Sequence, residues 1–131
     1  MNKKLDKILA EISAGELIDK ITILEIKKDK ISGKDKLNEV DKELSSLNET
    51  LKKSIIENSE ISVFKKQLKD INLKLWDVEN GKRLAEKNND FGPRFIELAR
   101  NVYRFNDERA KIKLKINETL GSNIKEIKSH F

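Results

Sequence analysis

The stretch "LNEVDKELSSLNETLKKSI", residues 37–55, decides the fold class. Its apolar residues recur every three or four positions: Leu37, Val40, Leu44, Leu47, Leu51 and Ile55. This spacing places them along one face of an α-helix and is typical of helices that pack as coiled coils. The positions between them are mostly polar or charged, so the opposite face is expected to lie in solvent. We therefore predict a long amphipathic helix over about residues 35–57.

A helix is also predicted before this stretch. The segment "GELIDKITILEIKKDKI" has helical spacing of apolar residues and predicts a helix over about residues 14–31. Ser13 and Glu16 have the spacing of a capping box, in which each side chain binds the backbone N–H of the other residue. Residues 1–12 form either a short helix or an extended lead-in, and the pattern does not distinguish these two possibilities.

Two further helices are predicted after it. Apolar residues at spacings of 4, 3, 4 and 3 predict a helix over about residues 60–88: Phe64, Leu68, Ile71, Leu75 and Val78. Gly81 is expected to weaken this helix by about 1 kcal/mol relative to alanine. Pro93 suits the first turn of the last helix, which is expected to end at Leu120 because Gly121 is a natural helix stop.

Together these segments predict an all-α fold, an antiparallel bundle of three to four long helices with coiled-coil-like packing. The 131 residues form one predicted domain, 1–131, which ends in a short tail over residues 122–131. Because only 37% of the residues are hydrophobic, the core of such long helices must be thin. A second copy would cover the exposed ends, so we expect a homodimer.

Composition excludes several classes of site. There is no cysteine, and the single histidine is His130, so disulfides and a zinc centre are not expected, and neither is a cofactor. The net charge is +5, but 23 acidic residues are mixed among 28 basic ones, which argues against nucleic-acid binding. No run of about 18 apolar residues is present, so we expect no membrane-spanning segment and a cytoplasmic location.

Several polar residues interrupt the predicted apolar faces. The apolar arc of the last helix includes four of them: Asn106, Arg109, Lys113 and Asn117. Glu25 lies on the apolar side of the first helix, and Asn72 and Glu79 lie on the apolar side of the third. An unpaired buried charge is very costly, so these groups are expected to bind one another. We expect Arg109 to pair with Glu25 or Glu79. This set forms either a closed structural network that fixes helix register or a polar ligand pocket.

The arginines are unevenly distributed. All five lie within 27 residues: Arg83, Arg94, Arg100, Arg104 and Arg109. Because arginine binds anions with a planar, bidentate group that lysine lacks, these positions are either sites that require a guanidinium or a chance cluster.

Three segments resemble an uncharacterised bacterial family of short helical proteins with a domain of unknown function. They are "GELIDKITILEIK", "LWDVE" and "DFGPRFIELARNVYRFND". The resemblance covers about residues 13–122 and implies an all-helical domain with no assigned activity. The matching positions are Glu16, Asp19, Lys20, Glu25, Lys27, Trp76, Asp77, Glu79, Asn106, Asp107 and Arg109.

These observations lead to two functional hypotheses. The first is a helical binding or scaffold module that acts on a protein partner. The alternative is a pocket for a small anion or a sugar phosphate inside the bundle, with catalysis left open. The residues expected to form such a pocket are Glu25, Glu79, Asn106, Arg109 and Lys113. A closed core beside an exposed apolar surface would favour the first hypothesis.

Overall fold

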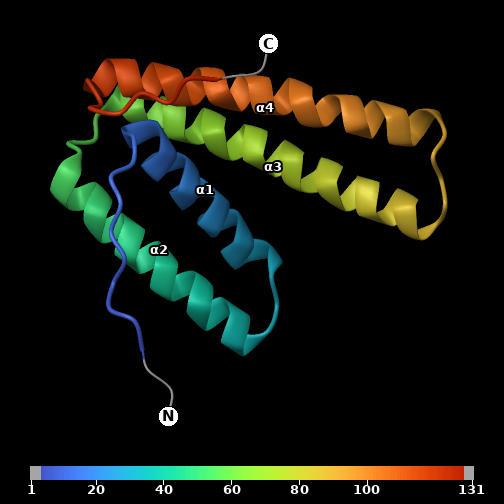
Figure 1. Ribbon diagram of the computed structural model, residues 1–131, viewed down its shortest axis with the longest axis horizontal. Coiled ribbons are helices and arrows are strands. Elements are labelled where there is room, and N and C mark those ends of the chain that lie inside the picture. Colours follow the sequence, from blue (N-terminus) through green and yellow to red (C-terminus); the bar gives the residue numbers. More distant parts are fainter. Residues whose placement is uncertain (1–3, 129–131) are drawn as a thin grey trace.

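The computed structural model describes residues 4–128, which form four α-helices and no strand (Figure 1). They are α1 (Ala14–Lys30), α2 (Lys34–Ser54), α3 (Ser59–Lys87) and α4 (Pro93–Leu120). The predicted all-α helical bundle is confirmed, and each helix ends within a few residues of its predicted bounds. The lead-in is irregular from residue 4 to Ser13. His130 lies outside the described residues.

The helix ends show which sequence signals determine them. Ser13 precedes α1, and its side chain accepts a hydrogen bond from the Glu16 N–H at 3.0 Å. Asn58 caps α3 in the same way, accepting from the Ile61 N–H at 2.9 Å. Gly121 ends α4 in the left-handed conformation, with φ of 62°. Side-chain caps satisfy backbone N–H groups that have no partner within the helix.

The helices form two antiparallel hairpins, α1–α2 and α3–α4, which lie close together at one end and diverge at the other (Figure 1). Helix α1 is central, because it packs against each of the other three helices. The core accordingly gathers along α1: Leu17, Ile18, Ile21, Leu24, Val40, Leu44, Leu51, Ile61, Leu68, Ile71 and Ile116 are buried together. Helix α1 is therefore buried over a wider arc than a helix with one neighbour.

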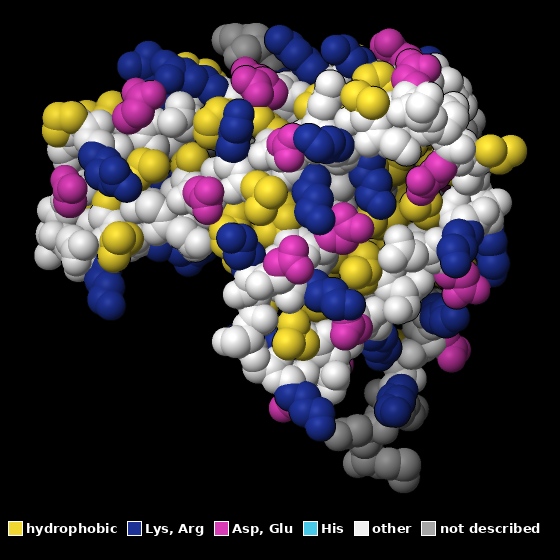
Figure 2. Space-filling model, turned by 180° about the vertical axis from the view of Figure 1, so that it is seen from behind, with side chains coloured by type: hydrophobic (Ala, Val, Ile, Leu, Met, Phe, Trp, Pro, Cys, Tyr) yellow, Lys and Arg dark blue, Asp and Glu magenta, His cyan; other side chains and the backbone are white. Residues whose placement is uncertain are grey.

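The far half of the α3–α4 hairpin projects beyond α1 and α2 (Figure 1). We call residues 79–105 the distal arm. Four large hydrophobic side chains are more than half exposed there: Leu84 (57%), Phe91 (51%), Ile96 (54%) and Tyr103 (55%). Seen from behind, apolar side chains on the arm lie between charged ones (Figure 2). Ile96 and Tyr103 remain uncovered because no helix in the described part of the chain packs on that side of the arm.

None of the helices in the described part of the chain is both long enough and apolar enough to cross a membrane.

Candidate functional site

A polar network lies where α1, α3 and α4 meet. Its centre is Asp19 on α1, whose side chain is completely buried. Arg109 on α4 donates from Nε to both carboxylate oxygens of Asp19, at 3.0 and 3.2 Å, and also from Nη2. Asn72 on α3 donates from Nδ2 to Asp19 Oδ1 at 2.9 Å. One carboxylate therefore connects three helices.

Two further side chains close the network. Thr22 Oγ1 accepts a hydrogen bond from Asn72 Nδ2 at 3.0 Å and donates to the backbone carbonyl of Asp19 at 2.8 Å. On the other side, Arg109 Nη1 donates to Asn106 Oδ1 at 3.4 Å. The hydrogen bonds to Asp19 raise the pKa of Arg109 despite the opposing effect of burial. We refer to Asp19, Thr22, Asn72, Asn106 and Arg109 as the interior polar network.

The prediction that Arg109 pairs with Glu25 or Glu79 is wrong, because its partner is Asp19. Glu25 instead forms ion pairs with Lys65 and Lys69, at 3.6 and 3.4 Å. Glu79 forms an ion pair with Lys82, one helical turn away, at 3.5 Å. Both glutamates are partly exposed and face basic residues of α3. Glu25 also points away from α4, because six residues separate it from Asp19 and turn the side chain by about 120° around the helix.

Asp19 was missed because the apolar stripe predicted for α1 was too narrow, comprising only Leu17, Ile18, Ile21, Leu24 and Ile31. Ile26 lies on the same side of α1 as Asp19 and is only 2% exposed, although it is outside that stripe. Residues seven apart on a helix share a face, so Ile26 was a signal that this side is buried. Asp19 was also among the positions that match the family pattern.

Lys113 holds the first turn of α1 against α4. Its Nζ lies 2.5 Å from Glu16 Oε2 and 3.2 Å from Glu126 Oε1, and its side chain is 13% exposed. Burial lowers the pKa of Lys113, but the hydrogen bond and the charge of Glu16 outweigh this effect and raise it. Burial likewise raises the pKa of Glu16, but Lys113 and then Lys20 outweigh this and lower it. The capping box is therefore only half formed, since the Glu16 carboxylate binds Lys113 instead of reaching back.

The same end of α1 makes very close contact with α4. The Gly15 N–H donates to Asn117 Oδ1 at 2.6 Å. A Cβ atom on Gly15 would lie 2.5 Å from the backbone oxygen of Lys113, so a side chain has no room there. Asn117 is fully buried, as its place on the apolar arc predicted, and the described residues offer its Nδ2 no hydrogen-bond partner.

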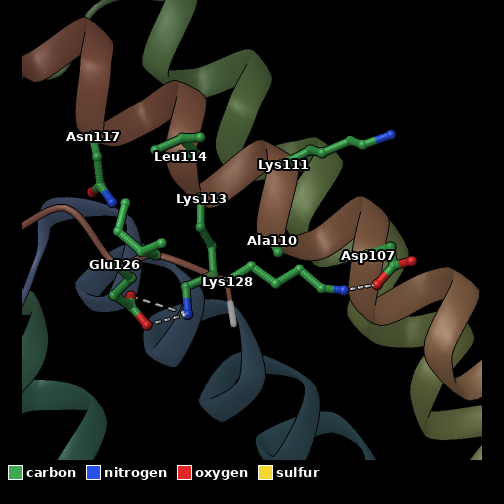
Figure 3. Close-up of a pocket in the computed structure, with 9 residues that line it drawn as sticks. Asp107, Ala110, Lys111, Lys113, Leu114, Asn117, Glu126 and Lys128 are labelled. Carbon is green, nitrogen blue, oxygen red and sulfur yellow. Dashed lines mark hydrogen bonds and ion pairs between the residues drawn. The ribbon is translucent and has the colours of Figure 1, made fainter. Parts of the chain in front are cut away.

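Residues 122–128, which we call the C-terminal strap, run back along α4. Ser122 Oγ accepts from the Ala14 N–H at 3.0 Å, and the Ser13 hydroxyl donates to Glu126 at 3.0 Å. Figure 3 shows Glu126 directed at the Lys113 ammonium and Lys128 paired with Asp107 further along the helix. Polar contacts to α1 and α4 therefore hold the strap in place.

A pocket of about 370 Å³ lies between the strap and α4 (Figure 3). Its apolar lining comes from Ala110, Leu114 and Ile127. Ile127 is nevertheless 81% exposed, so the strap covers this part of α4 poorly. We call this the strap pocket.

A second pocket of about 400 Å³ lies beside the interior polar network, between α1 and α3. Arg83, Trp76 and Glu79 line it together with Asn72 and Arg109. We call this the α1–α3 pocket. Its lining combines two guanidinium groups with an aromatic wall.

The five predicted pocket residues are not gathered into one site. Glu79 and Arg109 line the α1–α3 pocket, and Asn106 is bonded to Arg109. Lys113 lines the strap pocket, and Glu25 lies apart from both pockets, against α3. No group of three or more acidic or histidine side chains in residues 4–128 is arranged to hold a metal ion.

The arginines have different environments. Arg109 uses its planar group to bind Asp19 in a bidentate manner, as expected for a position that requires arginine. Arg104 donates to Glu97 at 3.2 Å on the surface of α4. Arg83, Arg94 and Arg100 are exposed on the distal arm.

A family model matches residues 8–130, and the chain belongs to that family, which is described as "Family of unknown function (DUF6165)". No curated protein and no solved structure shows significant similarity to the chain.

Proposed function

We propose that this member of the family is a helical binding or scaffold module that acts on a protein partner, with the distal arm as its contact surface. The observation that carries this proposal is the exposure of Leu84, Phe91, Ile96 and Tyr103 on one projecting hairpin. Exposed apolar side chains that gather on one part of a protein are characteristic of interaction sites.

The interior supports the same proposal. Asp19 is occupied by Arg109, and Lys113 is occupied by Glu16 and Glu126. A ligand in the bundle would have to break these pairs and leave a charge without its partner, which is costly for buried groups. The interior charges are therefore best explained as connections between helices, and binding is expected at the surface.

A photocrosslinking residue placed in the arm tests this function in cells that produce the protein. Substitution at Leu84 or Tyr103 is expected to give a discrete crosslinked product with a protein. The matched control is Val63, which is similarly exposed (54%) but lies on α3 outside the arm. Ile96→Glu should abolish the products formed from the arm positions. Absence of a product, or the same product from Val63, would contradict the proposal.

A second candidate function is a site for a small anion or a sugar phosphate in the α1–α3 pocket. It is favoured by Arg83, an exposed guanidinium that lines this pocket beside Trp76 and close to Arg109, which itself remains bound to Asp19. Arginine binds phosphate and carboxylate groups in a bidentate manner. The measurement is a thermal-shift screen with phosphate, sulfate, dicarboxylates and sugar phosphates. Stabilisation lost in Arg83→Gln but kept in Arg94→Gln would support this site, and no stabilisation by any anion would exclude it.

A further inference from the structure

Helix α4 carries a second apolar stripe, which lies beside the face that packs against α1 and α3 and is left uncovered beyond the end of α1. It consists of Ile96, Ala99, Tyr103, Ala110 and Leu114, at spacings of 3, 4, 7 and 4. These positions share one side of a helix, and Asp107 lies on the same line between Tyr103 and Ala110. Ile96, Ala99 and Tyr103 are exposed, whereas Ala110 and Leu114 lie under the strap. We call this set the outer stripe of α4.

The strap shows which kind of segment this stripe accepts. Ile127 places an aliphatic side chain at the pocket lined by Ala110 and Leu114. The next residue, Lys128, places a cation on Asp107. The stripe therefore accepts a positive charge at Asp107, whereas Ile127 is 81% exposed and leaves the apolar surface of Ala110 and Leu114 largely uncovered.

We infer that the outer stripe binds the outer stripe of a second copy of this chain, with the two α4 helices antiparallel. This inference rests on the proposed function and names the partner. In a register centred on Tyr103, Ile96 of one copy lies opposite Ala110 of the other, so a large residue meets a small one. Arg100 of one copy then lies beside Asp107 of the other. Ile96 and Arg100 are one helical turn apart and would replace Ile127 and Lys128 of the strap.

The charges around the stripe agree with this pairing. Arg100 is exposed and faces the same side of α4 as the stripe, and the strap's Lys128 shows that Asp107 accepts a cation there. The antiparallel register brings these opposite charges together at two symmetric positions, as a two-fold interface requires. From Ile96 to Ala110 the seam is about 21 Å long, or about four turns. Such a short seam implies a weak, concentration-dependent dimer with which the strap competes.

Sedimentation equilibrium over a concentration series tests the dimer. Ile96→Glu is expected to weaken dimerisation more than tenfold, while the matched control Val63→Glu leaves it unchanged. Both side chains are 54% exposed, so neither substitution should impair folding. Replacing Ile127 and Lys128 by serine removes the strap's competing contacts with the stripe, including the ion pair with Asp107, and should strengthen dimerisation by about three- to fivefold.

A charge exchange tests the register. Arg100→Asp and Asp107→Arg should each weaken the dimer, and the two substitutions together should restore it, because each copy then offers the reversed pair. A monomer at all concentrations, a dimer unaffected by Ile96→Glu, or failure of the double variant to recover would overturn the inference. Crosslinking from Tyr103 separates this failure from failure of the proposed function. A product with a different protein keeps the function and excludes the second copy, whereas no product contradicts both.

Discussion

Arg109 on α4 forms a bidentate ion pair with Asp19, a carboxylate that is fully buried in α1. Arg109→Leu should therefore leave a buried carboxylate without its cation. We expect a loss of about 3–5 kcal/mol in the free energy of unfolding. Adding Asp19→Asn removes the uncompensated charge and should recover much of this loss, a non-additivity that a double-mutant cycle in urea measures. Arg94→Leu, at an exposed position of the same helix, should change stability by less than about 0.5 kcal/mol. A loss below about 1 kcal/mol for Arg109→Leu would show that the pair is not a connection between helices.

The Glu16–Lys113 pair predicts how stability depends on pH. The folded-state pKa of Glu16 is lowered from 4.5, so its contribution is present above pH 4.5 and is lost as the pH falls through the folded value. The pKa of Lys113 is raised from 10.5, so its contribution is lost only as the pH rises through the folded value. Thermal unfolding measured from neutral pH down to about pH 2 should therefore show that the stability of the protein falls in acid. Lys113→Met should make this fall smaller. Lys66→Met, which removes only an exposed pair with Asp70, is the control. Equal acid dependence in Lys113→Met and the wild type would contradict this assignment.

Periodicity predicted the helices and the inward side of α4 because both depend on local spacing. Arg109, Lys113 and Asn117 all face the core or the α1–α4 seam, as their positions on the helical wheel indicated. The partner of Arg109 could not be predicted in this way. Helix α1 contacts three neighbours and is buried over a wide arc, and the number of neighbours is a property of the topology, not of the helix itself.

The strap was not predicted for a different reason. Residues 122–128 have no periodic pattern, and their positions depend on individual contacts, such as those of Glu126 with Ser13 and Lys113. Contacts between an irregular segment and distant helices leave no signature in local spacing. The α1–α3 pocket combines predicted residues with Arg83, which spacing did not select as inward-facing because it lies on the exposed side of α3.

The two capping side chains can be compared directly. Ser13 and Asn58 each accept a hydrogen bond from a backbone N–H in the first turn of a helix. Asn58→Ala should lower the free energy of unfolding by about 1 kcal/mol, because this hydrogen bond is lost. Ser13→Ala should cost more, because the Ser13 hydroxyl also donates to Glu126 and so holds the strap. Urea unfolding measures both losses, and hydrogen exchange of the strap amides should increase only in Ser13→Ala. Unchanged stability in Ser13→Ala would show that Ser13 is not the cap.

Alanine in place of two glycines should have opposite effects. At Gly15 the new Cβ would lie 2.5 Å from the Lys113 backbone oxygen, which cannot rotate away, so α1 and α4 must separate. The separation also lengthens the hydrogen bond from the Gly15 N–H to Asn117 Oδ1. We expect the free energy of unfolding to fall by about 2–4 kcal/mol. At Gly81 the nearest atoms are 3.2 Å away in the side chain of Leu98, which is only partly buried and can adjust. There the higher helix propensity of alanine should make the protein up to about 1 kcal/mol more stable. Urea midpoints at constant m-value measure both changes, and similar midpoints for the two variants would show that the α1–α4 contact is not rigid.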